Sequence, residues 1–185
     1  MNNVLMTSSH KWHLAALVLG ITVVTVSCDN AGQPAANNAA PAAPVVENAR
    51  ANIKFSQDTV QAKPGMDVVV TILMSDLPTT EGGGISLAYD SSMVNVSAVQ
   101  VNQAVWKFVN TNGVTDNVAG KVNDVLFSNY SAVPGNAEIA TITIHPVRSG
   151  NSQIVLSGSA VNPFASNGES LSVSFGRLQV NTTAN

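Results

Sequence analysis

Several residue types are scarce in this chain of 185 residues, and each scarcity excludes a class of protein. One Cys cannot form a disulfide within the chain, and one Cys with three His cannot supply a Cys/His zinc cluster. Charged residues make up only 10%, with 8 Lys and Arg against 11 Asp and Glu. Proteins that bind nucleic acid carry a surplus of Lys and Arg to neutralise phosphates. We therefore expect no nucleic-acid binding.

Residues that favour helices are scarce as well. Leu, Glu, Lys and Arg together number 23, whereas the β-branched residues Val, Ile and Thr number 48. Asn and Ser, which compete with helices and favour turns, add 20 and 19 residues. This composition disfavours a helical bundle or coiled coil and predicts an all-β protein. The length suits one domain of ordinary size with additional segments.

No apolar run has the length of a transmembrane helix. The longest run, Leu14–Val26, has thirteen residues and follows a segment whose only formal positive charge is Lys11. As a helix it would span about 20 Å, whereas the hydrocarbon core of a bilayer is about 30 Å thick. This length is typical of the apolar part of a signal peptide.

The apolar run ends in Val26-Ser27-Cys28, which resembles the signal of bacterial lipoproteins, although Thr25 stands where Leu is commoner. In that family an aliphatic or small pair and then Gly, Ala or Ser precede a lipid-modified Cys. The resemblance implies a signal peptide over residues 1–27 and a lipid on Cys28. The protein would then be anchored to a membrane of the bacterial cell envelope, facing the periplasm or the exterior. The alternative is an ordinary secretory signal with a chance Cys.

Residues 28–51 contain almost no large apolar side chains and are rich in Ala, Pro and Asn. Pro34, Pro41 and Pro44 interrupt any helix that the Ala residues would favour. Such a segment cannot bury a core, so the sequence predicts a flexible linker that is partly extended as polyproline II. A tethered domain of this kind suits a binding module better than a buried membrane subunit.

From Asn52 onward the pattern is that of short strands separated by turns. In Met66–Met74 alternate residues are apolar, and Ile85, Leu87 and Tyr89 likewise alternate with small residues. Further strands are predicted over 94–96, 122–127, 139–144, 154–156, 171–175 and 178–180. Turns are predicted at Pro64-Gly65, Gly82–Gly84, Asp90–Ser92, Asn112-Gly113, Gly120-Lys121, Pro134-Gly135, Ser149–Asn151 and Asn167-Gly168. This spacing predicts a two-sheet antiparallel β-sandwich over residues 52–181, jelly-roll-like in type.

Three segments of this domain follow a recognisable order: Thr59–Gly65 before the Val-rich strand, Gly84–Val96 with its Tyr89-Asp90 pair, and Pro134–Ile144. They resemble the cohesins, the sandwich modules of cellulosomal scaffolds, and the related carbohydrate-binding modules. The roles of Tyr89 and Asp90 can also be inferred without the resemblance. We expect the Tyr89 ring to be buried with its hydroxyl in a hydrogen bond, and the Asp90 carboxylate to cap the following turn.

The cohesin resemblance implies a flat sheet face that docks a helical, calcium-loaded dockerin. Type I cohesins often carry Asp or Asn just ahead of the Tyr-Asp strand as a partner contact, whereas this chain has Gly82–Gly84 there. The interface would then come from other side chains, such as Ser86 and Ala88.

No residue pattern predicts catalysis. His145 is not spaced with a Ser or Cys nucleophile, so we expect a solvent-exposed or capping His, and the four Glu residues are scattered singly. Asn110–Asn117 places side-chain oxygens at intervals, as calcium loops do, but it lacks their dense Asp series and terminal Glu. Asn112-Gly113 is better interpreted as a hairpin turn. We therefore expect no enzyme and no cofactor, and calcium has no further support.

Trp106 and Phe108 share one face of an assumed extended stretch, and they are the candidate contacts for a glycan or a partner. Planar aromatic rings stack on sugars, but such strips usually need two or three coplanar rings. The alternative, which we favour, is that Trp106 closes one end of the core.

The sequence leaves three hypotheses for function. The first is a lipid-anchored, cohesin-like module that recruits a protein partner at the envelope, dockerin-like or other, in polysaccharide degradation. The second is glycan binding to a polysaccharide, as in the related carbohydrate-binding modules. The third is a structural accessory lipoprotein of a secretion or surface assembly.

Overall fold

The structure, a computed structural model, describes residues 45–184. The predicted signal peptide, Cys28 and the linker up to residue 44 lie outside the described residues. Within residues 45–184, the only helical element is a short 3-10 turn, and no helix has the length and apolarity needed to cross a membrane.

Twelve strands and one 3-10 helix make up the described part of the chain. Their bounds are η1 Asn48–Arg50, β1 Ile53–Phe55, β2 Thr59–Ala62, β3 Val68–Met74, β4 Thr80–Tyr89, β5 Val94–Val101, β6 Phe108–Asp116, β7 Lys121–Val133, β8 Ala137–Pro146, β9 Gly150–Gly158, β10 Ala165–Ser166, β11 Glu169–Ser170 and β12 Arg177–Thr182.

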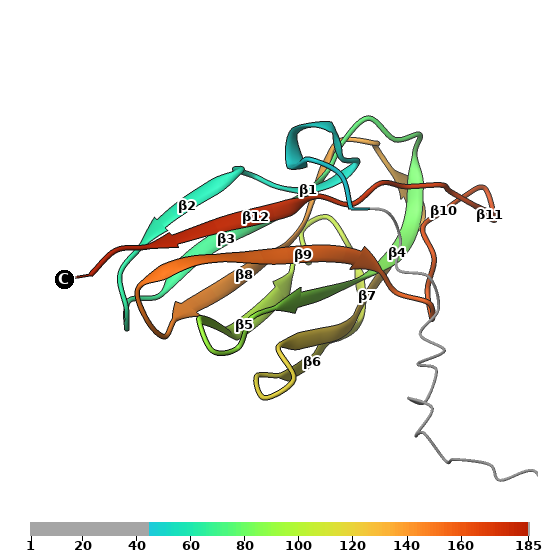
Figure 1. Ribbon diagram of the computed structural model, residues 1–185. Coiled ribbons are helices and arrows are strands. Elements are labelled where there is room, and N and C mark those ends of the chain that lie inside the picture. The colour runs from blue at the N-terminus through green and yellow to red at the C-terminus, as the bar shows by residue number, and fades with distance from the viewer. Residues whose placement is uncertain (1–44, 185) are drawn as a thin grey trace, which may run out of the picture. The chain divides into compact units, whose positions relative to one another are not determined.

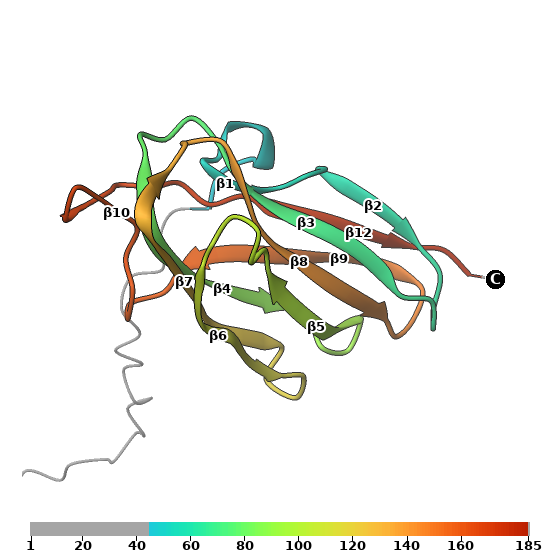
Figure 2. The same cartoon turned by 180° about the vertical axis from the view of Figure 1, so that it is seen from behind.

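The strands form two sheets that pack face to face. The first sheet has the order β1-β3-β8-β5, and the second runs β6-β7-β4-β9-β12-β2, with β10 and β11 beside the first part of β4. Figure 1 shows β9 and β12 of the second sheet in front, and Figure 2 shows β3 and β8 of the first. All pairs are antiparallel except β2 with β12, where Val60 lies opposite Val180. The predicted β-sandwich is confirmed.

The core lies between the sheets and is built from the alternate residues that the sequence pattern selects. Val70, Ile72 and Met74 of β3 are buried, as are Ile85 and Leu87 of β4. Burying one such side chain contributes about 1.5–3 kcal/mol to folding. Met66 differs from the prediction because it lies in the turn before β3, where it is 59% exposed.

Gly82–Gly84 were predicted as a turn, but they lie inside β4, the strand between β7 and β9. A Cβ on Gly83 would lie 2.7 Å from Cδ1 of Phe164, and a Cβ on Gly84 would lie 2.7 Å from Cδ2 of Leu126. The glycines therefore allow close approach of side chains to the strand, a function that their turn propensity does not reveal.

The predicted hairpin at Asn112-Gly113 is also wrong, because β6 continues through it. The β6–β7 turn comes later, where Oδ1 of Asp116 accepts hydrogen bonds of 2.9 Å from the N–H groups of Val118 and Ala119. Gly113 has φ +90° within β6, and a Cβ there would lie 2.8 Å from two inward Val side chains of β7. The positive φ of Gly113 therefore belongs to a local irregularity within β6 and not to a turn that reverses the chain direction.

Near the C-terminus, the predicted strand over Leu171–Phe175 is not formed. Only Glu169-Ser170 pair as β11, and Phe175 makes isolated parallel bridges with Val45 and Ile53. Residues 171–175 place the Phe175 ring in the core and do not add a strand to either sheet.

The predicted linker extends to residue 51, whereas residues 45–51 belong to the folded unit. Asn48 is only 6% exposed, and its side chain exchanges hydrogen bonds of 2.9 and 2.8 Å with the C=O and N–H of Phe55. Ala51 is buried as well. The side-chain amide of Asn48 pairs with the backbone N–H and C=O of Phe55, as a neighbouring strand would. The Ala-, Pro- and Asn-rich composition of the segment does not reveal this contact.

Candidate docking face

Trp106, a predicted candidate contact, is a core residue. Its side chain is 0% exposed, its ring centroid lies 4.6 Å from that of Phe127, and its Nε1–H donates a 2.9 Å hydrogen bond to the C=O of Glu138. A ring in this position cannot stack on a sugar at the surface. The interpretation that Trp106 closes the core, which the sequence favoured, agrees with the structure.

Trp106 and Phe108 do not share a face, because the chain before β6 turns rather than extends. The N–H groups of Val105 and Trp106 both donate to the C=O of Asn102. This turn breaks the alternation assumed for the stretch, so Trp106 points inward while Phe108, opposite Ser128 of β7, lies on the outer side.

Phe108 meets an aromatic residue that the sequence reasoning missed. Its ring centroid lies 4.2 Å from that of Tyr130, edge to face, and Tyr130 is 89% exposed. The outward position of Tyr130 could have been found from the alternation of β7, in which Val125 and Phe127 are buried and Leu126 and Ser128 are not. Extending that alternation by two residues places Tyr130 on the outer side.

The outer side of β6, β7, β4 and β9 forms a surface that we call the docking face. At its centre Ser86 and Ala88 alternate with the buried Ile85, Leu87 and Tyr89. Ser86 lies opposite Ser157 of β9, and Ala88 lies opposite Val155. The side chains here are small, so the centre of the face is flat, as the resemblance implies.

Apolar side chains surround this centre. Val114 of β6 is 66% exposed and Val161, in the loop after β9, is 69% exposed, in addition to Tyr130. Single exposed apolar residues are normal, and these three are apolar side chains on or beside this face that a partner could contact.

A polar cluster occupies the middle of the docking face. Asp124 lies at a bulge of β7 opposite Ser86, with φ +56°. The hydroxyl of Ser159 donates a 2.6 Å hydrogen bond to Oδ1 of Asp124, and the N–H of Asp124 donates to Oγ of Ser86 at 3.1 Å. A non-glycine residue at positive φ is strained, so the surrounding contacts hold this carboxylate in a fixed position.

The loop after β9 is tied to the face. The side-chain amide of Asn162 donates a 2.9 Å hydrogen bond to the C=O of Gly83, and a Cβ on Gly84 would lie 2.7 Å from the Cβ of Ser159. The loop therefore lies directly on the glycines of β4 and carries Val161 with it. The missing side chain at Gly84 makes room for this loop.

The Tyr89-Asp90 pair behaves as expected. Tyr89 is 8% exposed, and burial raises the pKa of its hydroxyl. Oδ1 of Asp90 accepts a 2.9 Å hydrogen bond from the N–H of Ser92, and hydrogen bonds from the Ser92 hydroxyl and this N–H lower the pKa of Asp90. Both residues stabilise the fold and lie outside the docking face.

The remaining candidates for chemistry are engaged in local contacts. Nδ1 of His145 lies 2.6 Å from Oδ1 of Asp67, and both side chains are about half exposed, at 42% and 53%. In the predicted calcium-like segment, Asn112 and Asn117 use their side-chain oxygens to accept backbone N–H groups of β5. Among residues 45–184 no three His, Cys, Asp or Glu side chains gather in a way that could hold a metal ion.

Known structures resemble this domain in fold, but their sequence identities to it are low. No protein-family model and no curated protein matches the chain. A non-cellulosomal cohesin from the archaeon Archaeoglobus fulgidus aligns with a TM-score of 0.58 and 11% identity, over 71% of this chain and 90% of that one. A chain of a type I cohesin–dockerin complex from Clostridium thermocellum aligns with a TM-score of 0.56 and 17% identity, over 71% and 99%.

A third match is the cohesin CaCohA2 from Clostridium acetobutylicum, with a TM-score of 0.53 and 18% identity over 74% of this chain and 95% of that one. The described domain therefore has the fold of cohesin domains, as the resemblance of its three segments predicts.

Proposed function

We propose that this chain is a non-catalytic protein-interaction module whose docking face binds a dockerin-like partner. Two observations support the proposal. The domain has the cohesin fold, and the solved structures similar to it include cohesin–dockerin complexes. The second observation is the docking face itself, which combines a flat centre with exposed apolar side chains.

The observation that carries the proposal is the position of Tyr130. Its ring is 89% exposed and packs edge to face against Phe108, so a large apolar surface is available to a partner. Exposed aromatic residues of this kind commonly contribute the largest share of binding energy at protein interfaces. Ser86 and Ala88, further along the same face, would let the backbone of a partner helix approach closely.

The test measures binding of the full-length protein to a dockerin-like protein from the same genome, recognised by duplicated Asx-rich calcium loops. We expect calorimetry to show saturable binding in calcium that is lost with a chelator. Tyr130→Ala should weaken it at least tenfold, which corresponds to about 1.4 kcal/mol. The matched control is Val69→Ala, which removes an apolar side chain that is 62% exposed on the first sheet.

Two results would contradict the proposal. The first is the absence of binding to every dockerin-like protein of that genome. The second is weakening by Val69→Ala with no effect of Tyr130→Ala, which would move the interface to the other sheet.

We further propose that the module is anchored to a bacterial envelope membrane through a lipid on Cys28, and that its partner acts in polysaccharide degradation. The motif Val26-Ser27-Cys28 at the end of a thirteen-residue apolar run supports the anchor. In cell fractionation the protein should be found with membranes, and Cys28→Ser should release it to the soluble fraction. Equal membrane retention of both forms would contradict lipidation.

A further inference from the structure

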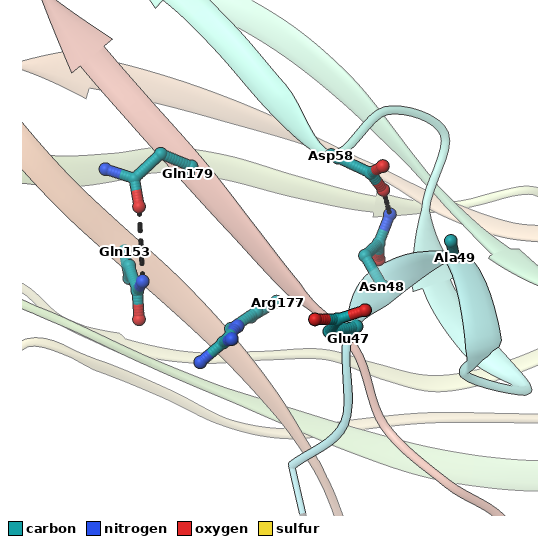
Figure 3. A pocket seen from close by; sticks show the side chains of 7 residues that line it. All are labelled: Glu47, Asn48, Ala49, Asp58, Gln153, Arg177 and Gln179. Atoms are coloured by element: carbon teal, nitrogen blue, oxygen red, sulfur yellow. Dashed lines mark hydrogen bonds between the residues drawn. The ribbon is translucent and has the colours of Figure 1, made fainter.

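A polar depression of about 290 Å³ lies next to η1 (Figure 3) and borders the docking face, because its Arg177 lies opposite Val155 of β9. It is formed where the segment before β1 meets β9 and β12. The lining residues are Glu47, Asn48, Ala49, Asp58, Gln153, Arg177 and Gln179.

Two hydrogen bonds fix Asp58, which forms one wall of the depression. Asn48 donates a 2.9 Å hydrogen bond to Oδ1 of Asp58, and the backbone C=O of Asp58 accepts the N–H of Gln179 at 2.9 Å. Asn48 itself is held by hydrogen bonds of 2.9 and 2.8 Å with the C=O and N–H of Phe55. The Asp58 carboxylate is therefore held in place before any ligand arrives, which lowers the entropic cost of binding.

Two amides on neighbouring strands face the same space. Gln153 of β9 lies opposite Gln179 of β12, and its Nε2 donates a 3.2 Å hydrogen bond to Oε1 of Gln179. Figure 3 shows this pair on the side of the depression away from Glu47. The bond fixes both amides and leaves the Nε2 donors of Gln179 and the Oε1 acceptor of Gln153 available to a ligand.

The depression carries charged groups of both signs. Within residues 45–184, neither Arg177 nor Glu47 forms an ion pair or a side-chain hydrogen bond. The carboxylates of Glu47 and Asp58 and the guanidinium of Arg177 place acceptors and donors side by side in the depression. A neutral ligand whose groups both donate and accept hydrogen bonds can use all of them.

We propose that this depression binds one neutral, polyhydroxylated ring, the chemistry of a single sugar unit. Adjacent hydroxyl groups both donate and accept, and they match the planar guanidinium, carboxylate and amide groups that line the site. At about 30 Å³ per water, the volume holds about ten waters, which is comparable to the space of one hydrated sugar ring. The sugar is either free or the terminal unit of a longer glycan.

The experiment is an NMR titration of the ¹⁵N-labelled full-length protein with glucose, galactose, mannose and N-acetylglucosamine, each up to 100 mM. We expect at least one sugar to shift the side-chain amide signals of Gln153 and Gln179 saturably. The dissociation constant should be on the order of 1–10 mM, since the depression has no aromatic platform. Disaccharides of the sugar that binds distinguish the two sources: a free-sugar site excludes them, and a glycan-end site accepts them with equal or higher affinity.

Arg177→Gln should weaken the affinity at least fivefold while leaving the melting temperature unchanged. Its matched control is Lys121→Gln, which removes a positive charge from an exposed residue of β7 on the docking face. No saturable shift with any of the four sugars would overturn the proposal. Equal weakening by both variants would overturn it too, and so would saturable binding of glycine in place of the sugars, which would assign the site to a zwitterion.

The sugar site and the docking face border each other, but their tests use different ligands and different variants. Binding of a dockerin-like protein tests Tyr130, and binding of a sugar tests Arg177, so the failure of one leaves the other standing.

Discussion

The hydroxyl of Tyr89 donates a 2.6 Å hydrogen bond to Oδ1 of Asn117, and this contact joins the two sheets at one end of the sandwich. Tyr89 ends β4 of the second sheet. The same Asn117 side chain accepts the N–H of Val96 at 3.0 Å and donates to its C=O at 3.1 Å, and Val96 belongs to β5 of the first sheet. One amide thus serves both backbone groups of a strand residue next to a bulge.

Replacing the members of this contact will destabilise the protein to different degrees. Tyr89→Phe should lower the free energy of unfolding by about 1 kcal/mol, because one hydrogen bond is lost. Asn117→Ala should cost about 2–3 kcal/mol, because two backbone groups of Val96 lose their partner together. Urea denaturation measures both. Tyr130→Phe is the control, with an exposed hydroxyl, and an effect as large as that of Tyr89→Phe would contradict the assignment.

The stability of the protein should fall at alkaline pH, in part through Tyr89. Burial raises the pKa of Tyr89 above its ordinary value of 10.0. In the unfolded chain the phenol loses its proton first, so its contribution is complete below about pH 10 and is lost as the pH rises through the raised pKa. Urea denaturation at pH 9 and pH 11 should show a smaller loss for Tyr89→Phe than for the natural chain. Equal losses would show that Tyr89 does not contribute.

The glycines of β4 should not tolerate a methyl group. Gly84→Ala places a Cβ 2.7 Å from Leu126 Cδ2 and from Ser159 Cβ, so either the loop after β9 or the neighbouring strand must move. We expect a loss of about 1–3 kcal/mol in the free energy of unfolding. Ala88→Ser, on the same strand and exposed, adds one atom without a clash and should change it by less than about 0.5 kcal/mol. A neutral Gly84→Ala would show that the loop is not held against the strand.

The backbone of Asp124 gives a prediction that is independent of its side chain. Asp124→Gly and Asp124→Ala both remove the bond from Ser159, but only Gly adopts φ +56° without strain. The Gly variant should therefore be more stable than the Ala variant by about 1 kcal/mol. At neighbouring Asn123, which has no positive φ, the order should reverse. The same order at both positions would contradict the strained conformation.

The architecture could be predicted from the sequence because one pattern, alternate burial along short strands, determines it. Ile85, Leu87 and Tyr89 alternate in the printed sequence and alternate in burial. The errors occur where a residue serves a tertiary contact. The sequence predicts a turn at Gly84 because it does not reveal that Leu126 and Ser159 occupy the space where a side chain would lie. Asn48 was assigned to a linker because its bonds to Phe55 are invisible in composition.

The candidate site was harder to predict than the fold. Ser86 and Ala88 follow directly from the alternation of β4 and were named from the sequence. Trp106 was placed by assuming an extended chain, and the turn at Asn102 reverses that assignment. Tyr130 lies beyond the last predicted position of its strand, which the pattern ended at residue 127, whereas β7 continues to Val133. The error in strand length thus concealed the most exposed aromatic side chain of the face.

The parallel pairing of β2 with β12 determines how late the sandwich can be completed. Val60 lies opposite Val180, a separation of about 120 residues, so the second sheet gains its edge strand only after nearly the whole chain is available. A chain that emerges from its N-terminus first has no partner for β2 until the last strand appears. Folding dominated by such distant contacts is slow, in the range of milliseconds to seconds. Until β12 is available, β9 also lacks one of its neighbours and presents an open edge to which a strand of another chain could add.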